Sequence, residues 1–185
     1  MHNRPFIRAF LKNPRQVGSI IQSSPFLVNK ITNSANLSKA GCVVELGAGT
    51  GAVTKKILKR TSPDCALLTF EINPLLAECV RKNIRDPRLK VIGDSAENIG
   101  LYLKQYGYSK ADCIISTLPL VTLPKPTTRK ILSRVYKYLA SGGQYIQFQY
   151  SLLSRDKIKQ FFPSMSIAFV PLNIPPAFVY VCVKD

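Results

Sequence analysis

The chain contains the sequence Val43-Val44-Glu45-Leu46-Gly47-Ala48-Gly49-Thr50-Gly51, an apolar run that ends in an acid and three alternate glycines. The apolar run predicts a buried strand that ends at Leu46, and residues 52–59 predict a helix directly after the glycines. Glycine permits both the sharp turn between them and a close approach of the backbone to a ligand. Because the amide end of the helix faces that ligand, the segment predicts a site for a nucleoside cofactor.

Beyond this segment, short β-rich runs alternate with helical patterns, which is typical of βαβ units and a mostly parallel sheet. We expect strands near 42–46, 66–71, 89–92, 112–116, 143–149, 166–170 and 177–183, and helices near 52–60, 74–84, 97–107, 126–139 and 154–161. Only the loop 171–176 separates the last two strands, so they should form an antiparallel hairpin. The predicted fold class is α/β: a Rossmann-like domain with a seven-stranded, mostly parallel sheet and helices on both faces.

The chain is strongly basic, with a formal net charge of +16, and before Asp64 its only acid is Glu45. Such a charge favours polyanions, either nucleic acid or an anionic membrane surface. Residues 3–12 place three cations four residues apart on one helical face and apolar side chains on the other, which predicts a basic amphipathic helix at a membrane interface. We therefore expect an N-terminal helical extension at 1–40, which binds the membrane and closes over the site, and a catalytic domain at 41–185.

The cysteines and the apolar windows bear on where the protein resides. The five cysteines show no CxxC spacing, which is typical of reduced core residues in a cytosolic protein, and no metal site is predicted. The apolar segment 6–11 is too short, and too interrupted by charged residues, to be a secretory signal. Prolines interrupt the apolar window 165–183, so it does not predict a membrane-spanning helix. We expect a cytoplasmic protein that associates peripherally with the inner face of the cell membrane.

The acids at the strand ends discriminate between cofactors. Gly47 to Ala52 also fits the loose GxGxxA pattern of NAD sites, but Glu45 favours the ammonium of an amino acid over a pyrophosphate. Glu71 can accept both ribose hydroxyls, and Asp94 can accept the adenine amino group. These groups favour S-adenosylmethionine. The predicted cofactor-binding residues are Glu45, Gly47, Ala48, Gly49, Thr50, Gly51, Glu71, Ile72, Asn73, Asp94, Ser95 and Ser24.

On these motifs, residues 40–185 resemble the class I S-adenosylmethionine-dependent methyltransferases. A narrower resemblance, to the bacterial phosphatidylethanolamine N-methyltransferase family, is carried by segments 13–19, 23–25, 116–120, 147–150 and 173–177. That family usually has Gly, Thr and Leu where this chain has Thr117, Gln149 and Ile174. The resemblance implies a phospholipid N-methyltransferase that acts at the membrane surface on phosphatidylethanolamine or its methylated derivatives.

N-methylation is an in-line displacement, so the positioning of the amine supplies much of the rate. The one histidine, His2, lies at the terminus, which leaves an acid, a tyrosine, a backbone carbonyl or water as the base. Tyr150 is the predicted aromatic partner of the methylated ammonium. The backbone carbonyls near Ser116 and Leu118 are predicted to hold the amine, with Pro119 fixing the turn.

Two alternatives remain open at this point. Ribosomal RNA adenine N6-methyltransferases also place a Leu-Pro pair after the fourth strand, and the positive charge suits RNA. They have Asn-Leu-Pro-Tyr or Asn-Leu-Pro-Phe, in which the asparagine accepts from the adenine amino group and the aromatic ring stacks on the base. This chain has Thr117 to Leu120 instead, so both groups are missing and nucleic acid is the less favoured partner. The other alternative is a non-catalytic S-adenosylmethionine-binding protein, and the oligomeric state is not predicted.

Overall fold

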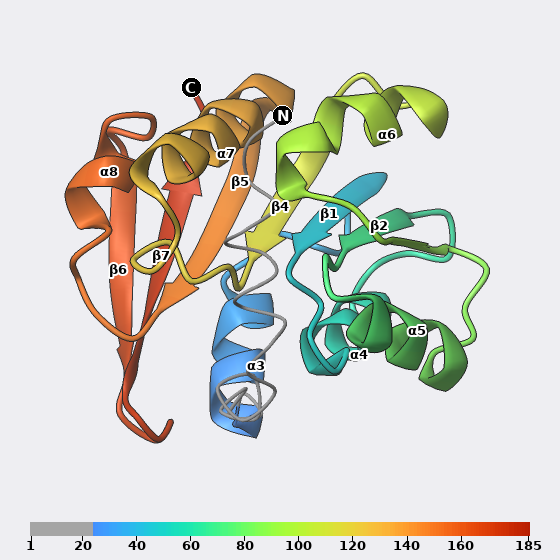
Figure 1. The fold of residues 1–185 in the computed structure, drawn as a ribbon, viewed down its shortest axis with the longest axis horizontal. Helices are drawn as coiled ribbons and strands as arrows, with labels where there is room; N and C mark the ends of the chain where they lie inside the picture. The colour runs from blue at the N-terminus through green and yellow to red at the C-terminus, as the bar shows by residue number, and fades with distance from the viewer. Residues whose placement is uncertain (1–23) are drawn as a thin grey trace.

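The computed structural model describes residues 24–185, so the predicted amphipathic helix at residues 3–12 lies outside the described range. One seven-stranded sheet has the order β3-β2-β1-β4-β5-β7-β6 (Figure 1). Strands β1 to β5 pair in parallel, whereas β7 pairs antiparallel with both β5 and β6. The predicted fold class and the terminal hairpin are confirmed. The strands are β1 (Cys42–Leu46), β2 (Ala66–Phe70), β3 (Leu89–Ile92), β4 (Ala111–Ser116), β5 (Leu139–Gln149), β6 (Met165–Val170) and β7 (Ala177–Val183).

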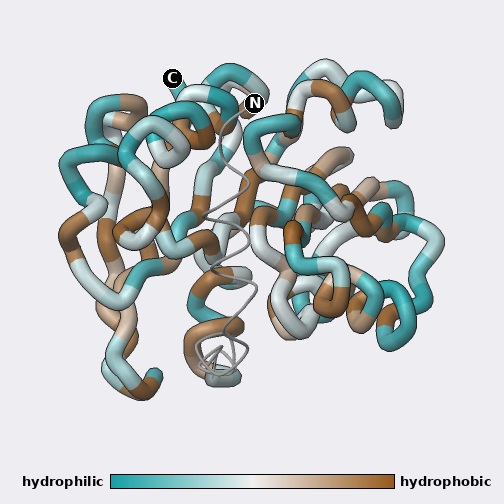
Figure 2. The backbone as a smooth tube through the Cα atoms, viewed as in Figure 1, coloured by the Kyte–Doolittle hydropathy of each residue, from teal (hydrophilic) through white to brown (hydrophobic). Residues whose placement is uncertain are grey.

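Helices cover both faces of the sheet, and hydrophobic residues concentrate along its strands (Figures 1 and 2). Neighbouring residues of β1 point to opposite faces, with Val43 in a core cluster under α3 and α4 and Val44 in a cluster under α6, α7 and α8. The helical elements are α3 (Pro25–Asn33), α4 (Ala52–Leu58), α5 (Pro74–Asn83), the short 3₁₀ helix η1 (Ala96–Asn98), α6 (Ile99–Gln105), α7 (Lys125–Tyr138) and α8 (Arg155–Lys159).

Helix α3 belongs to the core of the sheet domain. Its side chains Leu27 and Ile31 are fully buried and lie in the same cluster as Val53 and Ile57 of α4. Helix α3 also contacts β5, β6 and β7. The described part of the predicted N-terminal extension is therefore packed directly against the catalytic domain.

Strand β5 begins earlier than the sequence predicts, at Leu139 rather than near residue 143. Leu139 pairs with Ala111, but Gln144 pairs with Cys113, so a bulge interrupts the parallel register between β4 and β5. Gly142 has φ +70°, a backbone conformation that glycine adopts without steric cost. Residues 140–142 lie between the predicted helix and the predicted strand, whereas in the structure they belong to the longer strand and contain its irregularity.

The apolar window 165–183 forms β6, a proline-containing loop and β7, as predicted. Within residues 24–185, the structure contains no helix with the length and apolar character needed to span a bilayer.

Candidate functional site

The glycine loop after β1 has the backbone geometry that its sequence predicts. Gly47, Gly49 and Gly51 have φ of +85°, +56° and +85°. The amides of Gly47 and Ala48 both donate to the Phe70 carbonyl, at 2.8 and 3.1 Å, which ties the loop to the end of β2. A Cβ atom on Gly47 would lie 3.0 Å from the Thr117 hydroxyl oxygen. The loop is therefore closely fitted between the ends of β2 and β4.

Glu45 lies under this loop, with no exposed surface. Its Oε2 accepts hydrogen bonds from the hydroxyls of Thr54 at 2.7 Å and Thr69 at 2.9 Å. Its Oε1 has no hydrogen-bond partner among the described residues. Burial raises the pKa of the Glu45 carboxyl to about 7, although the two hydroxyl hydrogen bonds oppose the shift. A buried carboxylate oxygen without a partner is suited to accept a hydrogen bond from an ammonium group, which is the role predicted for Glu45 from the sequence.

We expect Glu45→Gln to remove one pH dependence of stability. Because the folded-state pKa lies above the ordinary value of 4.5, the folded protein keeps this proton longer than the unfolded chain does. The free energy of unfolding should therefore fall as pH rises through the interval from 4.5 to about 7, by on the order of 3 kcal/mol for this group. Urea unfolding of wild type and variant at several pH values measures the slope. Glu78→Gln, which changes a half-exposed carboxylate of α5, should keep the wild-type slope. An identical slope in the wild type and Glu45→Gln would contradict the assignment.

Glu71 follows β2 and is almost fully buried. Its Oε2 accepts from the Gly49 amide at 2.8 Å, and its Oε1 accepts from the Asn73 amide at 2.9 Å. Burial raises the pKa of this carboxyl, and the amides of Asn73, Gly49 and Ile72 oppose the rise. Each carboxylate oxygen retains a further lone pair, so the group can fix the glycine loop and still accept ribose hydroxyls.

Asp94 follows β3 and is held by its neighbours. Its Oδ1 accepts from the Ser95 amide at 2.6 Å, and its Oδ2 accepts from the side chains of Asn98 at 2.9 Å and Tyr102 at 3.0 Å. Partial burial raises the pKa of Asp94, but the hydrogen bonds from Asn98, Ser95 and Tyr102 outweigh it and leave the pKa below its ordinary value. Asp94 is therefore a fixed anionic acceptor, as an adenine amino group requires.

Three other predicted cofactor residues have side chains that cap helices. The side-chain oxygens of Ser24, Asn73 and Ser95 accept from backbone amides at the starts of α3, α5 and η1; these amides belong to Leu27, Leu75 and Glu97. Such caps stabilise helix starts by about 1 kcal/mol. Ile72, by contrast, is 39% exposed beside Glu71 and can contact a nucleobase. The predicted residues therefore divide into helix caps that shape the site and groups that are free to meet a ligand.

The residues present fit S-adenosylmethionine. The strand order places the ends of β3, β2, β1 and β4 side by side, so Asp94, Glu71 and the glycine loop lie along one edge of the sheet (Figure 1). Asp94 and Glu71 would hold the nucleoside, and the loop with Glu45 would hold the amino acid end. When bound, the sulfonium of the cofactor supplies an electrophilic methyl group.

The loop after β4 is tied to the glycine loop. The Thr117 hydroxyl donates to the Gly47 carbonyl at 2.6 Å, and the Thr117 amide donates to the Leu46 carbonyl at 2.9 Å. Leu120 is fully buried, whereas Pro119 is exposed. The threonine at position 117 thus connects the expected donor side of the site to the expected acceptor side.

Two glutamines that sequence reasoning did not assign hold the predicted acceptor carbonyl. The Leu118 carbonyl accepts from the side-chain amides of Gln147 at 3.1 Å and Gln149 at 2.7 Å. Both glutamines are buried on the same face of β5. Two buried polar residues at alternate positions of a core strand were the signal available in the sequence, because buried amides need partners. A carbonyl has two lone pairs, so an incoming amine must compete with these donors for Leu118.

Tyr150 lies at the end of β5 and is 42% exposed. Its ring packs edge-on against Phe148 with centroids 4.9 Å apart, and its hydroxyl forms a hydrogen bond with Asn173. Asn173 is fully buried and accepts from the Ser24 amide at 3.1 Å. The structure thus brings three distant segments together at Asn173. Ser116, in contrast, is fully buried in β4 and accepts from the Leu118 amide at 3.3 Å.

The family model for ribosomal RNA adenine dimethylase matches residues 10–139. The ornithine lipid N-methyltransferase of Singulisphaera acidiphila is 31% identical over 179 residues, which is 96% of this chain and 93% of that protein. The ribosomal RNA small subunit methyltransferase A of Ureaplasma urealyticum is 25% identical over 158 residues, which is 83% of this chain and 55% of that protein.

Solved structures share the fold. A precorrin-6y C5,15-methyltransferase from Geobacter metallireducens superposes with a TM-score of 0.69 at 15% identity, covering 86% of this chain and 88% of that one. Human N-acetylserotonin methyltransferase, solved with S-adenosylmethionine, gives a TM-score of 0.64 at 14% identity over 95% of this chain and 55% of that one. At these identities the likeness shows the fold alone.

Proposed function

We propose that this chain, which belongs to the ribosomal RNA adenine dimethylase family and is an S-adenosylmethionine-dependent methyltransferase, transfers its methyl group to the amine of a membrane lipid. The family is named for an RNA acceptor. The choice of acceptor, however, depends on the loop after β4 rather than on the cofactor-binding fold that the family shares. The proposed site of action is the inner face of the cell membrane.

The single observation that carries the proposal is the state of that loop. A flipped adenine needs an asparagine side chain and an aromatic ring around the Leu-Pro pair. Here the corresponding Thr117 hydroxyl bonds to the Gly47 carbonyl, and the corresponding Leu120 is fully buried. Two glutamine amides occupy the Leu118 carbonyl. The loop therefore presents neither an amide acceptor nor a stacking surface to a base.

The relatives support the same choice. The relative named for ornithine lipid matches this chain over nearly its whole length, whereas the ribosomal RNA relative from Ureaplasma urealyticum extends well beyond the matched 55% of its length. Ornithine lipid and phosphatidylethanolamine both carry a primary amine on a membrane lipid. We propose phosphatidylethanolamine and its methylated derivatives as the acceptors, with ornithine lipid as the second candidate on account of this relative.

The acceptor amine must lose a proton before it attacks, because its ordinary pKa, like that of lysine, is about 10. Residues 24–185 contain no histidine. Burial raises the pKa of Tyr150, and the hydrogen bond with Asn173 opposes the rise, so the phenol is neutral near pH 7. Tyr150 therefore positions the ammonium with its ring and does not accept the proton.

We expect Tyr150→Ala to lower methyl transfer about tenfold or more, because the cationic headgroup loses its aromatic partner. Tyr150→Phe keeps the ring and should retain activity within about threefold, since only the bond to Asn173 is lost. The loss in Tyr150→Ala should be greatest for the dimethylated acceptor, which has the fewest hydrogen-bond donors. Single-turnover rates with each methylated lipid measure this order.

The control for that series is Tyr106→Ala, which removes a tyrosine of similar exposure, 37%, at the end of α6. Its activity should equal that of the wild type. Equal losses in Tyr150→Phe and Tyr150→Ala would show that the hydroxyl, and not the ring, carries the role.

The cellular test of the proposal is expression in a bacterium whose phosphatidylethanolamine and ornithine lipids are unmethylated. Mass spectrometry of the lipid extract should show mono-, di- or trimethylated headgroups in cells with the wild-type chain. Cells with a Glu71→Ala variant should lack them. Unchanged lipids together with newly dimethylated adenines in ribosomal RNA would overturn the lipid assignment.

A further inference from the structure

The terminal hairpin has an unusual composition for this protein. Residues 160–183 contain no charged residue, in a chain with a net charge of +16. Strand β6 is the edge of the sheet, and edge strands usually carry charges that prevent association. The exposure of an uncharged hairpin at this edge of the sheet therefore needs an explanation.

The loop between β6 and β7 turns apolar side chains outward. Leu172 is 64% exposed and Ile174 is 83% exposed, while Asn173 between them is fully buried. The Asn173 side chain accepts from the Ser24 amide at 3.1 Å and donates to the Pro175 carbonyl at 2.7 Å. Because these bonds fix the asparagine inward, its two neighbours are held in the solvent.

Two phenylalanines near this loop are also exposed. Phe169 at the end of β6 is 56% exposed, and Phe26, two residues after Ser24 in α3, is also 56% exposed. We call Phe26, Phe169, Leu172 and Ile174 the apolar rim. Figure 1 shows that the β6–β7 loop and α3 both project from the edge of the sheet where β1, β4 and β5 end. The rim therefore lies on the face of the molecule that bears the site.

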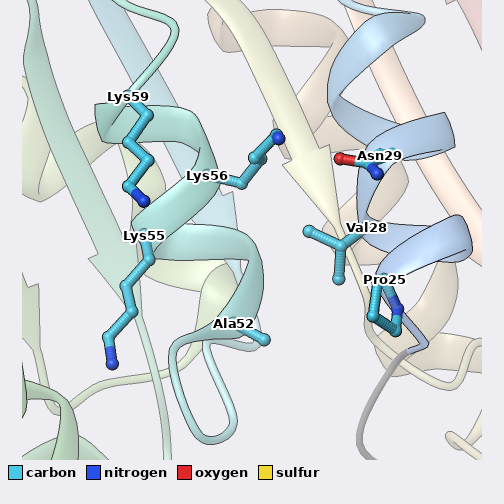
Figure 3. Close-up of a pocket in the computed structure, with 7 residues that line it drawn as sticks. All are labelled: Pro25, Val28, Asn29, Ala52, Lys55, Lys56 and Lys59. Atoms are coloured by element: carbon cyan, nitrogen blue, oxygen red, sulfur yellow. The ribbon is translucent and has the colours of Figure 1, made fainter.

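The rim is flanked by cations. A groove of about 370 Å³ runs between α3 and α4, with Pro25, Val28 and Ala52 as its apolar lining and Lys55, Lys56 and Lys59 among its polar residues. Figure 3 shows Lys56 directed across the groove toward Asn29 of α3. Helices α3 and α4 and the segment 165–183 contain no aspartate or glutamate. Exposed apolar side chains beside lysines, with no acids among them, suit an anionic bilayer, which has an apolar acyl layer beneath negatively charged headgroups.

On the basis of the proposed function, we propose that the apolar rim inserts into the acyl layer of an anionic phospholipid bilayer while the lysines of the groove meet its phosphates. Asn173 joins the rim to Tyr150. The lipid can then keep its chains in the bilayer while its amine reaches the ring of Tyr150. The rim residues all lie within the described part of the chain and include none of residues 3–12.

The chain contains no tryptophan, so a single introduced one reports on one place. With vesicles of phosphatidylethanolamine and phosphatidylglycerol, Ile174→Trp should show blue-shifted emission and quenching by brominated acyl chains. Vesicles of phosphatidylcholine alone should give a much smaller change. Leu101→Trp is the matched control, because Leu101 is 62% exposed on α6, away from the rim, and its emission should not change. The double variant Leu172→Ser with Ile174→Ser should bind the anionic vesicles about a hundredfold less tightly.

Two results would overturn the rim assignment. One is unchanged Ile174→Trp emission on vesicles to which the protein sediments. The other is emission that is already blue-shifted without lipid, since this would mean that the same chain or a second copy covers the rim. The fluorescence does not depend on methyl transfer, which separates the two proposals. Insertion without lipid methylation would overturn the proposed function, and lipid methylation without insertion would overturn the rim.

Discussion

Replacement of Gly47 by alanine is expected to lower methyl transfer about tenfold or more while the sheet remains folded. Gly47 has φ +85°, which costs a residue with a Cβ atom about 1–2 kcal/mol. The new Cβ would also lie 3.0 Å from the Thr117 hydroxyl oxygen and 3.1 Å from a Leu118 methyl group. The side chains of Thr117 and Leu118 must then move by a few tenths of an ångström, and they belong to the loop that is expected to position the acceptor. In-line transfer is sensitive to such shifts: a displacement of about 1 Å can cost a hundredfold in rate, so a few tenths of an ångström can cost on the order of tenfold.

Gly107→Ala provides the matched control for this substitution. Gly107 has φ +83°, and nothing lies within 4 Å of its Cβ position. It therefore imposes the same backbone strain without the steric contact. Its unfolding free energy should fall by about 1 kcal/mol, with cofactor affinity and turnover unchanged. Calorimetric titration with S-adenosylmethionine and single-turnover rates distinguish the two variants, and full activity of Gly47→Ala would refute the proposed coupling of the loops.

Asn173→Leu is expected to destabilise the protein by about 1–3 kcal/mol, because the replacement removes a buried side chain whose hydrogen bonds join separate segments. The Ser24 amide, the Pro175 carbonyl and the Tyr150 hydroxyl each lose a partner. The start of α3 and the hairpin loop are then no longer joined. We expect the lipid KM to rise more than about tenfold, whereas cofactor affinity should stay within about twofold, since none of these groups belongs to the glycine loop.

The control is Asn83→Leu, which replaces an exposed asparagine at the end of α5 whose side chain donates to the Cys79 sulfur. Surface changes of this kind should alter stability by less than about 0.5 kcal/mol. Urea unfolding and lipid-dependent kinetics measure both variants. A wild-type lipid KM in a folded Asn173→Leu protein would separate this cluster from acceptor binding.

Local patterns in the sequence predict the elements of this fold well. Alternating β-rich and helical segments locate all seven strands, and the glycine spacing locates the turn after β1. The placement of Glu71 and Asp94 at one edge of the sheet is predictable because acids that follow neighbouring parallel strands must lie at the same edge. These inferences need only the period of the side chains and the direction of the strands.

Such local patterns do not predict the hydrogen bonds between distant segments. Ser24 and Asn173 are 149 residues apart, and no local signal pairs them. The bonds from Gln147 and Gln149 to the Leu118 carbonyl also join different elements. For Glu45 the sequence indicates an acid near a ligand, but only the structure shows Thr54 and Thr69 against one of its oxygens. The packing of helices on the sheet sets these contacts.

The proposed acceptor is a lipid amine and not an adenine. A competition experiment tests this directly. Purified protein is incubated with S-adenosylmethionine labelled in its methyl group. The same tube holds vesicles that contain phosphatidylethanolamine or ornithine lipid, together with unmodified ribosomal RNA. Extraction into organic solvent then separates labelled lipid from labelled RNA. We predict label in the lipid headgroup and none above background in the RNA. Label in the RNA alone would contradict the account.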